Sequence, residues 1–167
     1  MKACFIGHRH ITNKKELSIP LNETIQKLIQ NGVTIFLFGS MSEFDELAWE
    51  IVTKLKILYP SIKRVYVRSS FKNIDKTYEK YLLKSYEETY FPQTLDKAGK
   101  CSYIKRNYEM INNSTYCIFY YNENYNPPLK RNITQQVLTS KTRRSGTKIA
   151  YTYALKKKKH IINLYKK

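Results

Sequence analysis

The stretch Cys4-Phe5-Ile6-Gly7-His8-Arg9 decides the fold class of this chain. A run of apolar residues stops at a glycine, and two side chains that can carry positive charge follow at once. A second apolar run, residues 33–38, stops in the same way at Gly39-Ser40, and a helix-like segment follows it. Strands that end on glycine and lead into a loop or helix are typical of open α/β sheets that bind phosphates and nucleotides. The pattern therefore predicts a class of ligand, and says less about catalysis.

Apolar periodicity predicts an alternation of strands and helices along the rest of the chain. The predicted strands are residues 2–6, 33–38, 65–67, 115–121 and 160–164. The predicted helices are about 21–30, after a loop over 11–20, then 43–58, 103–112 and 147–157, with a further helix near 78–86. This alternation predicts a single α/β domain over residues 1–167, in which helices cover both faces of a mostly parallel sheet of about five strands.

Composition limits the cellular setting. The 167 residues are 42% hydrophobic, enough for one domain with a real core. No apolar run approaches the roughly 20 residues that a membrane span needs, and Arg9, Lys14 and Lys15 come too early for a signal peptide. We therefore expect a cytoplasmic protein without a membrane partner.

Three cysteines, at positions 4, 101 and 117, have no metal-ligand spacing and form no CxxC pair. Cys4 and Cys117 lie in apolar strand-like runs, so we expect them to be buried as small hydrophobic residues. The sequence predicts neither a metal site nor a cofactor.

The formal net charge of +17 raises the question of nucleic-acid binding. Lysine dominates over arginine and much of it is scattered, and residues 156–159 are explained by the negative C-terminal end of a helix. Nucleic acid is therefore a less favoured partner than a small nucleotide-like molecule.

Four segments are expected to meet at one edge of the sheet, because ligands of parallel sheets bind outside the carboxyl ends of the strands. The candidate ligand-binding residues in these segments and in the helix at 103–112 are Gly7, His8, Arg9, Gly39, Ser40, Phe44, Asp45, Arg106, Asn107, Asn122, Glu123, Ser145, Gly146 and Thr147.

Each candidate offers something that an anionic nucleotide needs. Gly39 and Gly146 allow backbone amides to approach a phosphate, and the helix amino termini at Ser42 and Thr147 present unpaired N–H groups. The Arg9 guanidinium can donate two hydrogen bonds to one phosphate or carboxylate. The carboxylate of Asp45 or Glu123 can accept hydrogen bonds from ribose hydroxyls. Taken singly, each also has a structural explanation, as a helix cap or a hydrogen-bonded loop residue. No GxGxxG or P-loop motif is present.

A long polar segment, residues 122–145, separates the fourth predicted strand from the last helix. Its charges are Lys130, Arg131, Lys141, Arg143 and Arg144 against Glu123. Loops of this length are often functional, although a tolerated surface insertion explains it equally well.

With these motifs in hand, the chain resembles the YpsA-like branch of the SLOG superfamily, which is related to DprA and to the LOG (lysine-decarboxylase-like) proteins. Gly7-His8-Arg9 is similar to the opening of that branch, and residues 39–45 occupy the place of its Gly-Gly-small-x-Gly-Phe-Asp segment. Residues 106–111 resemble its Arg-Asn-x-x-Met-Val/Ile helix, and residues 145–147 with 160–164 resemble its Gly-Thr helix and closing strand.

The resemblance implies a Rossmann-like domain that binds a nucleotide or nucleotide-derived ligand. LOG relatives cleave nucleoside monophosphates, using an Arg-Lys-x-x-Met helix and a Gly-Gly-x-Gly-Thr-x-x-Glu turn. This chain has Asn107 in place of the lysine and Ala150 in place of the glutamate, so the carboxylate that would stabilise an oxocarbenium-like centre is missing from that position.

We therefore expect a non-catalytic or weakly catalytic ligand-binding module. A LOG-type nucleotide N-glycosidase and a nucleic-acid-binding protein related to DprA are the alternatives. Domains of this kind commonly self-associate through helices, so a homodimer is also expected as one arrangement.

Overall fold

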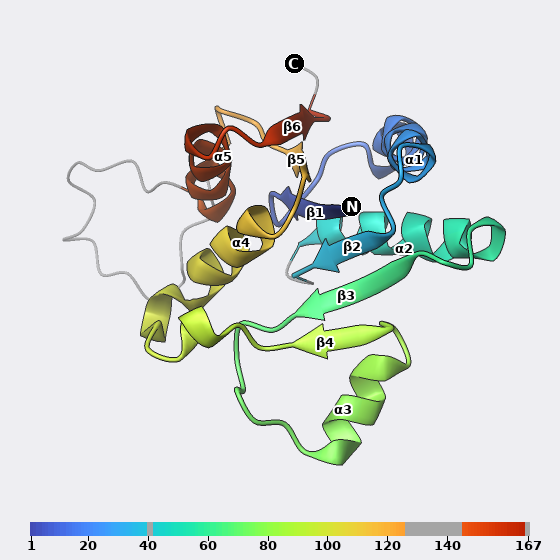
Figure 1. Ribbon diagram of the computed structural model, residues 1–167. Helices are drawn as coiled ribbons and strands as arrows, with labels where there is room; N and C mark the ends of the chain where they lie inside the picture. Colours follow the sequence, from blue (N-terminus) through green and yellow to red (C-terminus); the bar gives the residue numbers. More distant parts are fainter. Residues whose placement is uncertain (40–41, 126–144, 166–167) are drawn as a thin grey trace.

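The computed structural model describes residues 1–39, 42–125 and 145–165, which form one six-stranded sheet flanked by helices (Figure 1). The strands are β1 Lys2–Gly7, β2 Ile35–Phe38, β3 Lys63–Val67, β4 Glu88–Tyr90, β5 Tyr116–Tyr120 and β6 His160–Asn163. Their order is β4-β3-β2-β1-β5-β6, and every neighbouring pair is parallel. The predicted α/β class with a parallel, Rossmann-like sheet is confirmed.

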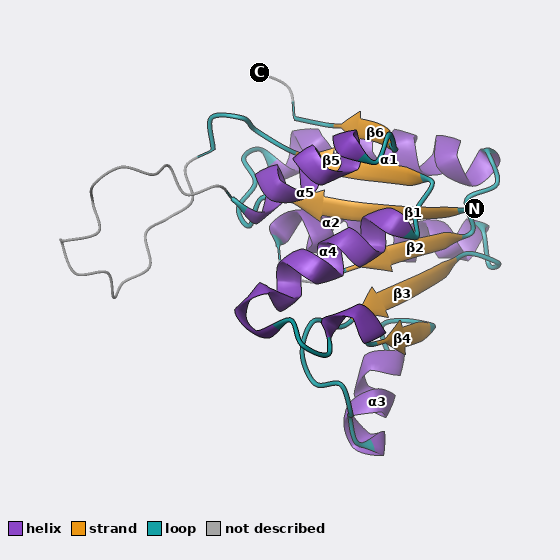
Figure 2. Ribbon diagram, turned by 60° about the vertical axis from the view of Figure 1, so that its left-hand side comes forward, coloured by secondary structure: helices purple, strands orange, loops and turns teal. Residues whose placement is uncertain are grey.

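Helices cover both faces of the sheet, which gives three layers (Figure 2). The helices are α1 Lys14–Gln30, α2 Glu43–Leu58, α3 Lys76–Leu83, α4 Ser102–Asn112 and α5 Gly146–Lys156, with short 3-10 turns at Gln93–Leu95 and Gly99–Cys101. β1 sets the two sides: Ala3 and Phe5 pack in a core with α1 and α2, whereas Cys4 and Ile6 pack in a second core with α4 and α5.

The strand order reverses beside β1, which makes this the topological switch point of the sheet. After β1 the chain builds outward through β2, β3 and β4, and it then returns to the other side of β1 with β5. The register pairs Cys4 with Cys117 and Gly7 with Tyr120, so β1 and β5 end together. In open α/β sheets, such a reversal of strand order is where ligands bind, outside the carboxyl ends.

Two details of the sequence prediction were wrong. The sheet has six strands rather than about five, because β4 is only three residues long and carries no apolar alternation for a pattern to detect. The first helix begins at Lys14 rather than Leu21 and contains Pro20. Leu17 lies on the same buried face as Leu21 and Ile25, and its burial favours extension of the helix through the proline.

The predicted state of the cysteines is confirmed, since Cys4 and Cys117 are buried while Cys101 is exposed. None of the described helices combines the length and the apolar composition needed to cross a bilayer.

Candidate functional site

The amino end of α5 is held at the carboxyl end of β1. Ser145 caps α5 by accepting a hydrogen bond from the Lys148 amide at 3.1 Å. The Thr147 hydroxyl, on the first turn, donates to the carbonyl oxygen of Gly7 at 2.9 Å. The short polar side chains of this turn thus fix a helix amino terminus, with its positive dipole end, beside the last residue of β1.

The amino end of α2 approaches the same residue from the other face. A Cβ on Gly7 would lie 2.5 Å from the Cβ of Phe44, which is fully buried against the ring of Phe5. Only glycine at position 7 therefore lets α2 pack this closely. Ser42 caps α2, because its hydroxyl accepts from the Asp45 amide at 3.1 Å and donates to the Asp45 carboxylate at 2.9 Å.

His8 joins β1 to the segment after β5. Its Nε2 accepts a hydrogen bond from the Asn122 amide at 2.9 Å, and its ring stacks on Tyr125 with centroids 3.9 Å apart. The side chain is 1% exposed, and this burial lowers its pKa to about 4. The ring is therefore neutral near neutral pH. Nε2 also lies 3.2 Å from the Asn122 carbonyl oxygen, but the Asn122 amide can only donate, so we assign the ring proton to Nδ1.

The Nδ1 atom of His8 is buried, and no described residue is within hydrogen-bonding distance of it. A buried donor without a partner is costly, so such groups point to a hydrogen bond made with something else.

Arg106 brings a buried cation to the carboxyl end of β2. Its Nη1 donates to the carbonyl oxygen of Gly39 at 2.6 Å, and its Nε and Nη2 donate to the Asn107 side-chain oxygen at 3.3 and 3.1 Å. The residue is 4% exposed, and burial lowers its pKa, an effect that the carboxylate of Asp45 opposes. A Cβ at position 39 would lie 2.6 Å from the Arg106 Cζ, so a larger residue there would displace the guanidinium.

Arg9 is exposed on the loop after β1, and this loop is fastened to α2. The Glu43 amide donates to the Arg9 carbonyl, and the Glu43 carboxylate accepts from the Ile11 amide and from His10 Nδ1, each at 2.9 Å. The Ile11 amide and the His10 side chain together lower the pKa of the Glu43 carboxyl. Arg9 thus lies beside the first turn of α2.

Most of the candidate residues meet at one edge of the sheet. Gly7 contacts Phe44 and Thr147, His8 contacts Asn122, and Gly39 contacts Arg106. Glu123 directly follows this group and is exposed, without a described hydrogen bond to another candidate. Ser40 and the basic residues 130–144 lie outside the described part of the chain. The placement agrees with the predicted convergence, while the ligand-binding role remains a prediction.

Sequence reasoning missed three contributors. Glu43 was not among the candidate residues, yet its carboxylate holds the Arg9 loop through the Ile11 amide. Tyr125 stacks on His8. The ring of Tyr103, from α4, lies so close to Gly146 that a Cβ at position 146 would be 3.2 Å from it. The adjacency of Glu43 to the Ser42 cap was the one available signal, because a carboxylate in a first helical turn is well placed to accept amides.

The described residues contain no group of three or more His, Cys, Asp or Glu side chains suited to a metal ion. Ala150, at the LOG glutamate position, is 1% exposed and packs in the core shared with Met110 and Phe119.

The carboxyl edge of the sheet is rich in hydrogen-bond donors. It holds the buried cation of Arg106, the neutral imidazole of His8 and the amino terminus of α5.

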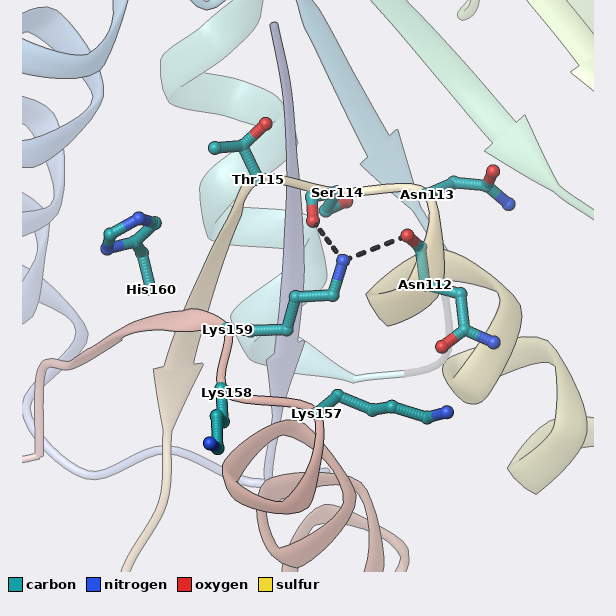
Figure 3. A pocket seen from close by; sticks show the side chains of 8 residues that line it. All are labelled: Asn112, Asn113, Ser114, Thr115, Lys157, Lys158, Lys159 and His160. Carbon is teal, nitrogen blue, oxygen red and sulfur yellow. Dashed lines mark hydrogen bonds between the residues drawn. The ribbon is translucent and has the colours of Figure 1, made fainter.

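A hollow of about 440 Å³ lies at the opposite edge of the sheet, before β5 and β6 (Figure 3). It contains none of the candidate residues. Lys159 donates there to the carbonyls of Asn112 and Ser114 at 2.9 and 2.8 Å, whereas the side chains of Lys157 and Lys158, which also line the hollow, run in other directions (Figure 3). Lys159 thus satisfies carbonyls just past the end of α4, and the lysines do not converge on a common point.

Residues 11–155 match the family model described as the YspA SLOG family. The match covers most of the chain, so the chain belongs to this family. The Gly7-His8-Arg9 segment precedes the matched range. No curated protein matches the chain.

Proposed function

We propose that this member of the YspA SLOG family binds a nucleotide or nucleotide-derived ligand at the carboxyl edge of β1, β2 and β5, without LOG-type catalysis. The observation that carries the proposal is the pair of buried donors at this edge. The Arg106 guanidinium is 4% exposed and the His8 side chain 1% exposed, and His8 Nδ1 has no described partner. Burying such groups is costly, and a polar, anionic ligand would offset that cost.

The phosphate is placed on the first turn of α5, at Gly146 and Thr147. The dipole and the amides of a helix amino terminus favour an anion there, and exposed Arg9 provides a counter-charge. The first turn of α2 is less suited, because its Glu43 and Asp45 amides already donate to Arg9 and Ser42. Arg106, which holds Gly39, shapes the floor of the site and contributes positive potential.

The ribose or base contacts are assigned to the β5 side. His8 Nδ1 offers a neutral donor, and Asn122 and Glu123 offer acceptors directly after β5. Asp45 is less available for this role, because its carboxylate accepts from Ser42 within the helix cap.

The alternative, a nucleotide N-glycosidase, lacks a carboxylate at Ala150, which is packed in the core. Incubation with AMP, GMP and CMP, followed by chromatography, tests it. We expect no protein-dependent release of free base, and release would establish the alternative.

The binding proposal is tested by thermal shift against a panel of nucleotides and ADP-ribose derivatives. We expect at least one ligand to stabilise the protein, and Arg9→Ala to reduce that shift. Lys2→Ala is the matched control, because Lys2 is an exposed cation at the opposite end of β1. A panel without any stabilising compound, or equal shifts in Arg9→Ala, would reject the proposal. The expected cytoplasmic location and homodimer remain predictions.

A further inference from the structure

Within the segment that joins β3 to β4, residues 69–84 extend beyond the body of the molecule, and we call these residues the arm (Figures 1 and 2). The residues that follow them, Tyr86 and Glu87, pack against the sheet. The helix of the arm, α3, lies outside the edge strand β4 (Figures 1 and 2). Within α3, only Leu82 is buried. Most of the surface of this eight-residue helix therefore faces solvent.

The arm exposes three aromatic side chains. Phe71 is 70% exposed, Tyr81 65% and Tyr78 37%. The rings of Tyr78 and Tyr81 are nearly parallel, at 13°, with centroids 6.2 Å apart. Large aromatic side chains usually bury much of their surface, so exposed rings held in a fixed mutual arrangement offer flat faces on which other planar groups can stack.

The same helix carries a row of positive charge. Lys76, Lys80 and Lys84 recur at every fourth position and are all exposed, so they follow one side of α3. No carboxylate in the described part of the chain pairs with any of the three within 4 Å. The Asp75 carboxylate is instead engaged as the α3 cap, on the Tyr78 amide at 2.8 Å. None of the three lysines is therefore neutralised by a close ion pair among the described residues, although the exposed Glu79 lies on the same helix.

We propose that the arm is a binding surface for single-stranded nucleic acid, with bases stacked on Tyr78 and Tyr81 and phosphates beside Lys76, Lys80 and Lys84. Single strands expose base faces for stacking and carry one phosphate per nucleotide, which matches both features of the surface. Duplexes keep their bases stacked inside, so they can use only the lysines. The proposal is independent of the ligand site at the β1, β2 and β5 edge.

A second copy of this chain fits the arm less well. A two-fold contact through α3 would bring two lysine rows together on a protein of net charge +17, and like charges oppose such a contact. An anionic membrane surface would match the lysines, but it offers no planar groups for the paired tyrosine rings.

The test is fluorescence anisotropy with labelled oligo(dT) and oligo(U) of about 20 nucleotides, and with a duplex of equal length. Tyr81→Phe keeps a ring for stacking, whereas Tyr81→Leu keeps apolar area without it. A triple Lys76→Gln, Lys80→Gln, Lys84→Gln variant removes the lysine row. Its control changes Lys15, Lys27 and Lys54 to Gln, which removes equal charge from exposed positions of α1 and α2. Circular dichroism verifies that each variant is folded.

We expect single strands to bind more tightly than the duplex, and affinity to fall steeply from about 50 to 200 mM salt. Tyr81→Leu weakens binding about tenfold, and Tyr81→Phe leaves it nearly unchanged. The arm lysine variant lowers the salt slope by about 2, and its control changes the slope little.

Three results would overturn the proposal. One is equal binding of single strands and duplex that Tyr81→Leu does not weaken. Another is that the protein cosediments with vesicles of mixed phosphatidylcholine and phosphatidylserine but binds no oligonucleotide. The third is self-association, measured by analytical ultracentrifugation, that the Tyr81→Leu variant abolishes while no oligonucleotide binds.

Discussion

The guanidinium of Arg106 lies against the backbone of Gly39 and donates from Nη1 to the Gly39 carbonyl oxygen at 2.6 Å. The two residues are 67 positions apart in the chain, yet this contact ties α4 to the carboxyl end of β2. It also fixes a buried positive charge next to the point beside β1 where the strand order reverses. The contact explains why position 39 is glycine and why the arginine of α4 is buried.

The first prediction concerns this contact. A Cβ at position 39 would lie 2.6 Å from the Arg106 Cζ, so Gly39→Ala must displace the guanidinium. We expect the free energy of unfolding to fall by about 1–3 kcal/mol, as for other overpacked sites. Urea denaturation measures this loss.

A double-mutant cycle with Arg106→Ala separates the cause. Removal of the Arg106 side chain relieves the collision, so Gly39→Ala should cost much less in the Arg106→Ala background. If Gly39→Ala costs the same in both backgrounds, the contact with Arg106 is not the reason for the glycine.

The second prediction concerns the anchor of α5. Thr147→Val removes the hydroxyl that donates to the Gly7 carbonyl at 2.9 Å, which leaves that acceptor unsatisfied. We expect a loss of about 1–2 kcal/mol in the free energy of unfolding, whereas Thr147→Ser retains the bond. Thr152→Val is the matched control, because the Thr152 hydroxyl donates to the Lys148 carbonyl at an exposed position. Equal losses of unfolding free energy in Thr147→Val and Thr152→Val would contradict the claim that the Thr147–Gly7 hydrogen bond anchors α5.

The third prediction concerns pH. Burial lowers the pKa of His8 from 6.5 to about 4, so the unfolded chain takes up a proton that the folded protein excludes. Stability should therefore decrease as pH falls through this window, by up to about 1.4 kcal/mol per pH unit from this group. Thermal denaturation at a series of pH values measures the slope.

His8→Asn should flatten that slope relative to the wild type. A His8→Asn variant with the wild-type slope between about pH 6.5 and 4 would show that another group titrates there.

The fourth prediction concerns the Arg9 loop. Glu43→Ala removes the acceptor of the Ile11 amide and the partner of His10, both at 2.9 Å. We expect faster hydrogen exchange at the Ile11 amide and a loss of about 1 kcal/mol in the free energy of unfolding. Glu46→Ala removes an equal charge from the same helical turn at an exposed position, and it should leave the Ile11 exchange rate unchanged.

The sequence was informative where local chemistry decides the structure. The apolar strand followed by Gly7 and the Ser42 cap lie as predicted, because each depends on residues a few positions apart. The last helix begins at Gly146, one residue before its predicted start. The convergence of their segments follows from the parallel order of the strands, so it was also predictable.

Contacts between distant segments were not predictable. The Arg106–Gly39 and Thr147–Gly7 pairs join residues 67 and 140 positions apart, and no local pattern encodes them. β4 was missed because three residues are too few for a periodicity, and the early start of α1 was missed because tertiary burial of Leu17 outweighs the local effect of Pro20.

The central claim is that the carboxyl edge of β1, β2 and β5 binds an anionic nucleotide-like ligand. Isothermal titration calorimetry with ADP-ribose, AMP and related nucleotides, on wild-type protein, Arg9→Ala and the control Lys2→Ala, tests it most directly. We predict saturable one-site binding of at least one compound, weakened about tenfold or more in Arg9→Ala and unchanged in Lys2→Ala. Absence of heat for every compound, or equal affinity in Arg9→Ala, would contradict the account.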